Sequence, residues 1–505
     1  MLDFFLAATA ATTSPTVLTL IFLVLAVGLA LSFEFVNGFH DTANAVATVI
    51  YTNTLKATPA VVWSGIWNLI GVLTSSGAVA FGIVALLPVE LVINIGSTAG
   101  FAMVFALLLS AITWNLGTWY FGLPASSSHT LIGSIMGVGL ANSMMQGGIH
   151  AFGSGVNWAK AKEVGMALLI SPVVGFVCAG VLFLLIKVLV KNPSLYKAPE
   201  GKAPPPWWIR FILLFTCTGV SFAHGSNDGQ KGMGLIVLIL VGILPGVYAL
   251  KMDAPNESVR QVAASALQLS GIFSKEAAGA KPPETELAST EAISAYLKND
   301  GTLTPATYAA LAGKSEVIAA TLKDAGNFQD LPEAARRDMR TDFYLVSSAI
   351  KKLNKTGVLT DPVARKAEVD FSTNVDTLTN YIPLWVKYAV AISLGLGTMI
   401  GYKRIVVTVG EKIGKSHLTY AQGASAEFVA MGTILAADHF GLPVSTTHVL
   451  SSGIAGTMAA NKSGLQMDTL RNILMAWVLT LPVCIFLGAL LFALGLNLLF
   501  LIGVR

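Results

Sequence analysis

Charged side chains are scarce in this chain, and their scarcity excludes an ordinary soluble fold. Only 12% of the 505 residues are charged, whereas 54% are hydrophobic. A typical soluble domain carries about 25% charged residues. Cysteines are also few: Cys178, Cys217 and Cys484 stand in apolar runs, with neither a disulfide framework nor zinc-ligand spacing. No basic stretch opens the chain, so we expect no removable signal peptide.

The charges that are present gather in one part of the chain. More than half of all Lys, Arg, Asp and Glu residues fall within 251–382, and the net charge of +4 is too small to suggest a nucleic-acid partner. We therefore expect a soluble insertion in a protein that otherwise lies in the lipid bilayer. The expected segments are a first membrane repeat (1–191), a basic Pro-rich linker (192–208), the start of a second repeat (209–250), the insertion (251–382) and the rest of that repeat (383–505).

Two sequence patterns recur, which indicates an internal repeat. FGLPASSSHTL at 121–131 returns as FGLPVSTTHVL at 440–450, and Gly38–Asp41 is echoed by Gly225–Asp228. Several apolar runs near these patterns are interrupted by Gly, Pro and polar residues, as in transporters with discontinuous helices. The fold we expect is an all-α polytopic membrane protein with two inverted repeats of about five spans each, containing broken helices or helical hairpins.

Basic residues in short loops set the expected orientation, because they favour the cytoplasmic side. We assume five crossings per repeat, with each aspartate motif inside one broken span. Most basic residues of the short loops then fall on one side of the membrane. That side receives Lys56, the 187–210 loop, Lys403, Arg404, Lys412, Lys415, Lys462 and Arg471, whereas the other receives Lys160 and Lys162. Both termini and the 251–382 insertion are then expected outside the cytoplasm.

Acidic residues inside apolar spans are the first candidate functional groups, because burying a charge in the bilayer is costly. They are Glu34, Asp41, Asp228, Glu427 and Asp438. Asp41 and Asn44 stand three positions apart, which places them on one helix face, and Asp228 and Lys231 repeat this spacing. We expect the neighbouring glycines to let backbone carbonyls leave the helix and bind ligands. These glycines are Gly38, Gly225, Gly229 and Gly232. The alternative is that these acids form structural ion pairs.

Hydroxyl side chains follow both FGLP segments and suggest an anion site. Ser126, Ser127 and Ser128 in the first repeat match Ser445, Thr446 and Thr447 in the second. Gly-Leu-Pro ends one helix, and a hydroxyl then caps the next. A helix N-terminus with free N–H groups and hydroxyl donors suits an oxyanion such as phosphate. The alternative is that small residues let helices pack closely. Carboxylates beside such a site argue for cation-coupled anion uptake.

These patterns resemble the inorganic phosphate transporter (PiT) family, in particular its bacterial low-affinity, proton-coupled members. The family signature G-A-N-D-x-x-N-A is similar to GFHDTANA at 38–45 and GSNDGQKG at 225–232, and the likeness covers nearly all of the membrane part. The resemblance implies phosphate transport in a bacterial inner membrane, with phosphate alone or as a neutral divalent-metal complex, by a homodimer. It assigns phosphate contacts to the six hydroxyl residues, and the family's functional aspartates and signature asparagine to Asp41, Asp228 and Asn44. The residues that we expect to contact the coupling ion, the proton or a metal–phosphate complex are Asp41, Asn44, Asp228, Lys231, His40 and Asn227.

Two departures from the signature bear on the coupling ion. His40 and Lys231 replace asparagines, and a fixed ammonium at Lys231 would compete with sodium. We therefore expect proton coupling, with Asp41 as the proton carrier and His40 as a relay. Sodium coupling, a sulfate or other oxyanion permease, and an intramembrane hydrolase remain as alternatives. Neither G-x-S-x-G nor H-E-x-x-H occurs, so we expect no enzyme and no cofactor.

Overall fold

The computed structural model describes residues 17–84, 86, 97–199, 201–298, 301–357 and 361–501, without the side chains of 41–44. Apart from one isolated bridge between Gly414 and Leu465, regular structure in these ranges is helical. The chain divides into two compact units. One takes in the described parts of 1–24, 88–101 and 237–381, and the other those of 25–87, 102–236 and 382–505.

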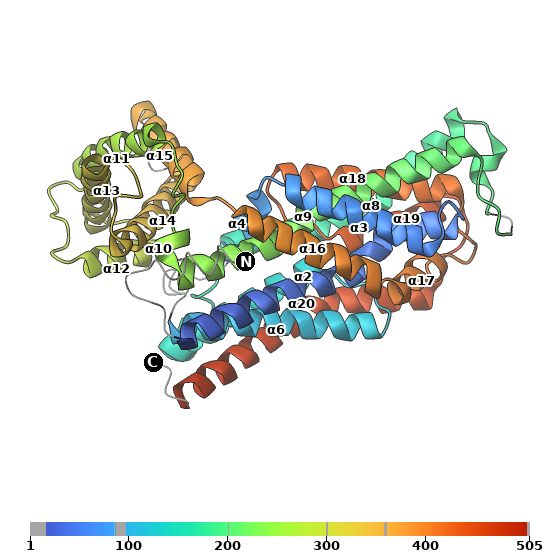
Figure 1. Cartoon of the computed structure of the whole chain (residues 1–505), viewed down its shortest axis with the longest axis horizontal. Coiled ribbons are helices and arrows are strands. Elements are labelled where there is room, and N and C mark those ends of the chain that lie inside the picture. The colour runs from blue at the N-terminus through green and yellow to red at the C-terminus, as the bar shows by residue number, and fades with distance from the viewer. Residues whose placement is uncertain are drawn as a thin grey trace. The chain divides into compact units, whose positions relative to one another are not determined.

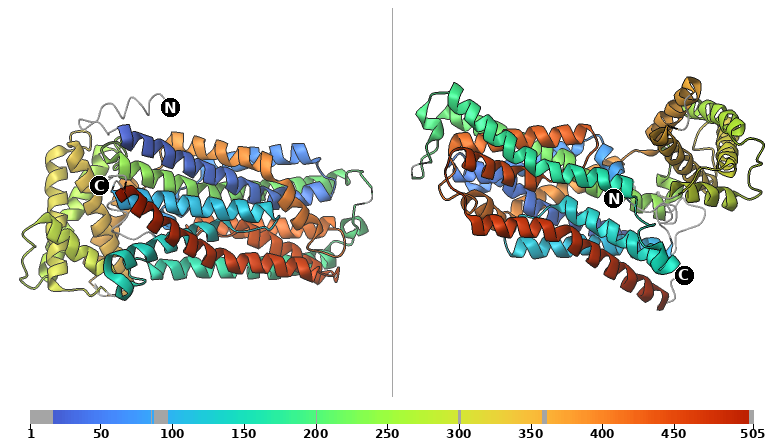
Figure 2. Two further views of the ribbon diagram at one scale, coloured as in Figure 1. Left: turned by 90° about the horizontal axis from the view of Figure 1, so that it is seen from below. Right: turned by 180° about the vertical axis from the view of Figure 1, so that it is seen from behind.

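The second of these units is a bundle of mainly long helices, most of them labelled in Figure 1 and seen from two other sides in Figure 2. Its helices in the first half of the chain are α2 (Val17–Tyr51), α3 (Ala57–Thr74), α4 (Ala78–Val84), α6 (Thr98–Tyr120), α7 (Ser127–Gly147), α8 (Trp158–Leu189) and α9 (Trp207–Ile243). The first residues of α2 and α6 and the last residues of α9 belong to the other unit. After the insertion come α16 (Leu384–Gly401), α17 (Lys403–Glu411), α18 (Tyr420–His439), α19 (Thr446–Ala460) and α20 (Met467–Leu501). Short 3₁₀ turns, η1 (Gly148–Ala151) and η2 (Pro193–Tyr196), lie in connections.

The bundle exposes apolar residues and buries polar ones, the reverse of a soluble protein. Leu169 and Val173 of α8 are 68% and 61% exposed, whereas Asn68 and Lys231 are fully buried. Within the described residues, seven helices are long and apolar enough to cross a membrane: α2, α3, α6, α8, α9, α16 and α20. The predicted all-helical membrane fold is thus confirmed. The inverted orientation of the repeats, their number of spans and the segment boundaries remain predictions.

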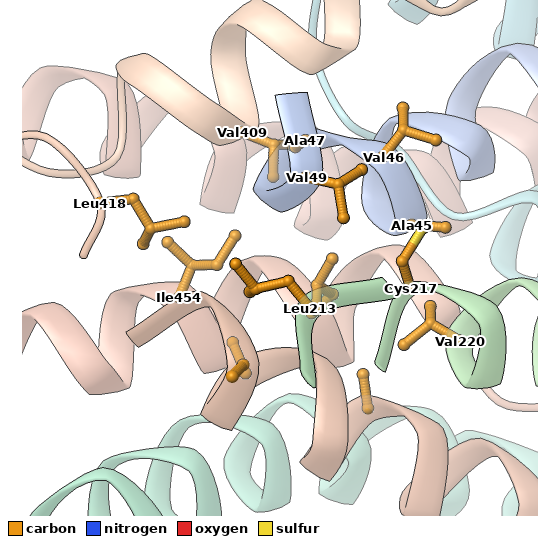
Figure 3. Close-up of a cluster of buried hydrophobic side chains, with 14 of the residues drawn as sticks. Ala45, Val46, Ala47, Val49, Leu213, Cys217, Val220, Val409, Leu418 and Ile454 are labelled. Carbon is orange, nitrogen blue, oxygen red and sulfur yellow. The ribbon is translucent and has the colours of Figure 1, made fainter. Parts of the chain in front are cut away.

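Helices of the two sequence halves pair with each other. α7 packs along α20, α8 along α19, and α3 along α16. α8 and α20 each carry an interior proline, Pro172 and Pro482. In Figure 3, apolar side chains of α2, α9, α17 and α19 point toward one another, among them Val49, Leu213 and Ile454. The apolar core of the bundle therefore forms between helices of the two sequence halves.

The glycines of the repeated motifs act differently from our expectation. α9 is helical from Trp207 to Ile243, so the chain does not unwind at Gly225–Gly232 to free carbonyls. Gly225 instead lets α9 approach α3, because a Cβ there would lie 2.1 Å from the Asn68 carbonyl oxygen. Gly38 similarly admits α16, since its Cβ would lie 2.5 Å from the Thr398 nitrogen. The prediction that the helix breaks within the second aspartate motif is therefore wrong.

The other unit holds a helical domain with a core of its own. It contains α10 (Pro245–Tyr248), α11 (Asn256–Glu276), α12 (Glu286–Leu297), α13 (Pro305–Ala325), α14 (Glu333–Thr356) and α15 (Pro362–Thr379). Apolar side chains such as Phe273, Phe343 and Phe371 fill the core. The buried Lys314 ammonium lies 2.6 Å from the Asp342 carboxylate. A core of this kind fits the soluble insertion expected from the charge distribution.

Candidate functional site

Each FGLP segment ends one helix and starts another, as the sequence predicts. α6 ends at Tyr120 and α7 begins at Ser127, where the Ser126 hydroxyl accepts a hydrogen bond from the His129 backbone N–H at 3.3 Å. In the second half, the Ser445 hydroxyl caps α19 by accepting from the His448 N–H at 3.1 Å. The capping hydroxyls satisfy one N–H in each first turn, and the remaining N–H groups point out of the helix start.

The two helix starts lie against each other. The imidazole rings of His129 and His448 have centroids 4.7 Å apart. The Ser128 hydroxyl donates to the Val444 carbonyl at 3.0 Å, which ties the first segment to the second. All six predicted hydroxyl residues are buried: Ser126, Ser127, Ser128, Ser445, Thr446 and Thr447. Two partial positive helix ends therefore meet in one buried, hydroxyl-rich region, which we call the cradle.

The second aspartate motif contributes a buried ion pair beside the cradle. The Lys231 ammonium lies 2.7 Å from Asp228 Oδ1, and both side chains are at most 1% exposed. The Ser127 hydroxyl donates to Asp228 Oδ2 at 3.3 Å. His224 Nε2 lies 3.4 Å from the same oxygen. Asp228 thus joins the cradle to the only lysine that the described contacts place in this part of the bundle.

Other residues of this motif fasten α9 to the second FGLP segment. The Asn227 side-chain amide donates to the Leu442 carbonyl at 3.2 Å. The Asp438 carboxylate accepts from the Ser226 hydroxyl and the Gln230 amide, each at 2.6 Å. Asn227 and Asp438 therefore take part in hydrogen bonds that join α9 to the second FGLP segment and the helix before it. These bonds help to position α9, which carries Asp228 to Ser127 at the start of α7.

The first aspartate motif is described only in part. The His40 imidazole nitrogen Nε2 lies 2.8 Å from the Asn115 carbonyl oxygen on α6. The side chains of Asp41 and Asn44 lie outside the described residues. Their assignment to the site stays a prediction.

Two buried polar groups of the bundle were not part of the site predicted from the sequence. Asn68 Oδ1 on α3 lies 2.5 Å from His224 Nδ1, and nothing in the surrounding sequence singles out this asparagine. The Glu427 carboxylate on α18 accepts hydrogen bonds from the hydroxyls of Thr48 and Thr216. Glu427 had a signal, since it is an acid within an apolar span, but the motif pattern did not include it.

The arrangement suits the binding of an anion within a bilayer. Helix N-termini and hydroxyl donors stabilise an oxyanion without a net charge of their own. The Asp228 carboxylate would repel an anion, but Lys231 neutralises it. Fold and site together define a polytopic membrane protein in which two helix starts meet in a buried, hydroxyl-rich region with the chemistry to attract an anion.

Comparisons with known proteins identify the family. The sequence model of the phosphate transporter family matches residues 37–488. The low-affinity inorganic phosphate transporter PitA of Escherichia coli (strain K12) is 40% identical over 496 residues, which cover 94% of this chain and 97% of that protein. A probable low-affinity inorganic phosphate transporter of Bacillus subtilis (strain 168) is 27% identical over 93% of this chain and 96% of its own length. This chain belongs to the phosphate transporter family.

A solved structure shows the same fold. The sodium-dependent phosphate transporter aligns with a TM-score of 0.50 and 20% identity, over 94% of this chain and 98% of its own. The likeness supports a shared overall fold over this part of the chain. The relatives are named as transporters, in agreement with the expectation that the protein is not an enzyme.

Proposed function

We propose that this protein imports inorganic phosphate across a bacterial inner membrane by proton symport and alternating access. The observation that carries the proposal is the meeting of two hydroxyl-lined helix starts beside the buried pair of Asp228 and Lys231. Membership of the phosphate transporter family supports phosphate as the substrate.

The cradle accounts for anion binding at a depth where charge is costly. N–H groups of α7 and α19 and the hydroxyls beside them replace the hydration of the phosphate oxygens. Ser127 contacts Asp228 in the structure, so a bound phosphate would lie close to the neutralised carboxylate. A carboxylate acceptor at this place favours a phosphate that carries a proton over fully ionised sulfate.

The proposed coupling ion is a proton. Lys231 places an ammonium 2.7 Å from Asp228, where a sodium ion would otherwise be a counter-cation. Asp41 remains the proton carrier predicted from the sequence, with His40 as its relay. Transport of phosphate as a neutral complex with a divalent metal, a homodimeric assembly and an extracytoplasmic insertion are further parts of the proposal.

Uptake of radiolabelled phosphate into proteoliposomes tests the function. With an imposed pH gradient in sodium-free buffer, we expect phosphate to accumulate in the proteoliposomes. If phosphate is transported as a complex with a divalent metal, accumulation should increase when magnesium is added. Excess unlabelled phosphate should compete, and equal sulfate should not. Accumulation that requires a sodium gradient would replace proton coupling with sodium coupling. Competition by sulfate equal to that by phosphate would indicate a general oxyanion permease.

A further inference from the structure

Glu34 is a buried acid that the proposed mechanism does not use. It lies on α2, one helical turn before Gly38, and is fully buried. The Asn37 side-chain amide donates to Glu34 Oε2 at 3.3 Å, whereas Oε1 accepts no hydrogen bond among the described residues. A buried carboxylate needs a cation, several hydrogen bonds or a proton of its own.

The Glu34 carboxyl group lies directly against α9 beside the ion pair. A Cβ added to Gly232 would lie 2.3 Å from Glu34 Cγ and 2.5 Å from Oε1, so the glycine makes room for the carboxyl group. Gly232 is the residue that follows Lys231. Glu34 therefore approaches the same stretch of α9 that holds Lys231 and Asp228.

The charges around Glu34 do not balance. Among the described residues, the titratable groups that interact with it electrostatically are Lys231, Asp228 and His224, all on α9. Lys231 is the one permanent cation of this set, and it already pairs with Asp228 at 2.7 Å. His224 is directed toward Asp228 and Asn68. Two carboxyl groups thus share one ammonium, and a proton on Glu34 makes the set neutral.

We propose that Glu34 is a proton-binding residue that couples phosphate binding to proton uptake through Lys231. With Glu34 protonated, Lys231 stays on Asp228, and phosphate meets a neutral pair. With Glu34 ionised, two carboxylates compete for Lys231, and the uncompensated negative charge repels phosphate from Ser127. Proton and phosphate therefore favour each other's binding, and this coupling is reciprocal.

The proton balance of this step is simple. Glu34 takes one proton from the side on which phosphate enters and forms an O–H bond. The bond breaks on the opposite side, when phosphate has left and Lys231 can interact with both carboxylates again. The inference rests on the proposed phosphate transport and gives the proton to a residue other than Asp41.

Proton uptake on phosphate binding tests the inference directly. Titration of the purified full-length protein with inorganic phosphate, by calorimetry in two buffers of different ionisation enthalpy, gives the protons bound per phosphate. Above neutral pH we expect wild type to take up one proton more than Glu34→Gln. Protons bound by phosphate itself contribute equally to both proteins, so they cancel when the proton uptake of the variant is subtracted from that of wild type. One linked proton changes the affinity for phosphate by up to about tenfold per pH unit. Glu34→Gln should lose this part of the pH dependence of phosphate affinity.

Two further variants complete the test. Glu34→Asp keeps an acid but withdraws it from Gly232, so proton uptake should persist with a shifted pH midpoint for phosphate binding. Glu163→Gln removes a partly exposed acid whose partner, Lys160, lies 2.6 Å away, and should behave as wild type. Equal proton uptake in wild type and Glu34→Gln, or an unshifted midpoint in Glu34→Asp, would overturn the inference and leave Asp41 as the carrier. Failure of wild type to bind phosphate would instead refute the proposed function.

Discussion

At the scale of single residues, the pair of Asp228 and Lys231 has a structural and a proposed functional role. Their spacing of three positions predicts contact on one helix face, and the structure places their charged atoms 2.7 Å apart. The contact of Asp228 with Ser127 could not be predicted, because it joins residues far apart in sequence. Removing one charge of a buried pair costs about 3–5 kcal/mol, since the other charge stays buried and alone.

A charge-pair cycle separates these two roles. Asp228→Asn should abolish phosphate uptake and destabilise the protein by about 3–5 kcal/mol, because Lys231 loses its counter-charge. The double variant Asp228→Asn with Lys231→Met removes both charges and should recover much of the stability without recovering uptake. Thermal unfolding in detergent and uptake into proteoliposomes provide the two measurements. Restored uptake in the double variant would show that the pair is structural only.

At the scale of helices, the sequence predicts where a helix begins better than whether a helix continues without a break. Gly-Leu-Pro followed by a hydroxyl correctly marks the beginnings of α7 and α19, because capping is a local property. The motif from Gly225 to Gly232 was wrongly expected to unwind. Whether a glycine breaks a helix or admits a neighbour depends on what packs against it, and here α3 and Glu34 do so. That information lies outside the local sequence.

The close approach of α9 to α3 gives a prediction for stability. Gly225→Ala places a methyl group 2.1 Å from the Asn68 carbonyl oxygen and should destabilise the protein by about 1–3 kcal/mol, the usual range for overpacking. Gly117→Ala in α6 is a matched control, because its Cβ would meet no atom within 4 Å. Alanine there should be neutral or stabilise the helix by up to about 1 kcal/mol. Thermal unfolding in detergent measures both, and equal melting temperatures would argue against close packing at Gly225.

At the scale of the whole molecule, the two sequence halves depend on each other within the bundle. α7 and α8 of the first half pack along α20 and α19 of the second, and the cradle forms where these pairs meet. The hydropathy pattern indicates the spans and the charge distribution indicates the insertion, but neither indicates which helices pair. The alternating access that we propose would therefore move helix pairs that each contain one member from either half.

Orientation in the membrane is the remaining whole-molecule prediction, and it follows from the basic residues of the short loops. In a background with Cys178→Ser, which removes the exposed native thiol, a cysteine at Val317 in α13 should react with a membrane-impermeant thiol reagent added to intact spheroplasts. Val317 is 51% exposed, so burial does not protect it. A cysteine at Lys202, in the exposed basic linker, should react only after the cells are opened. The reverse labelling pattern would place the insertion in the cytoplasm and the linker outside it, which would contradict the orientation predicted from the basic residues.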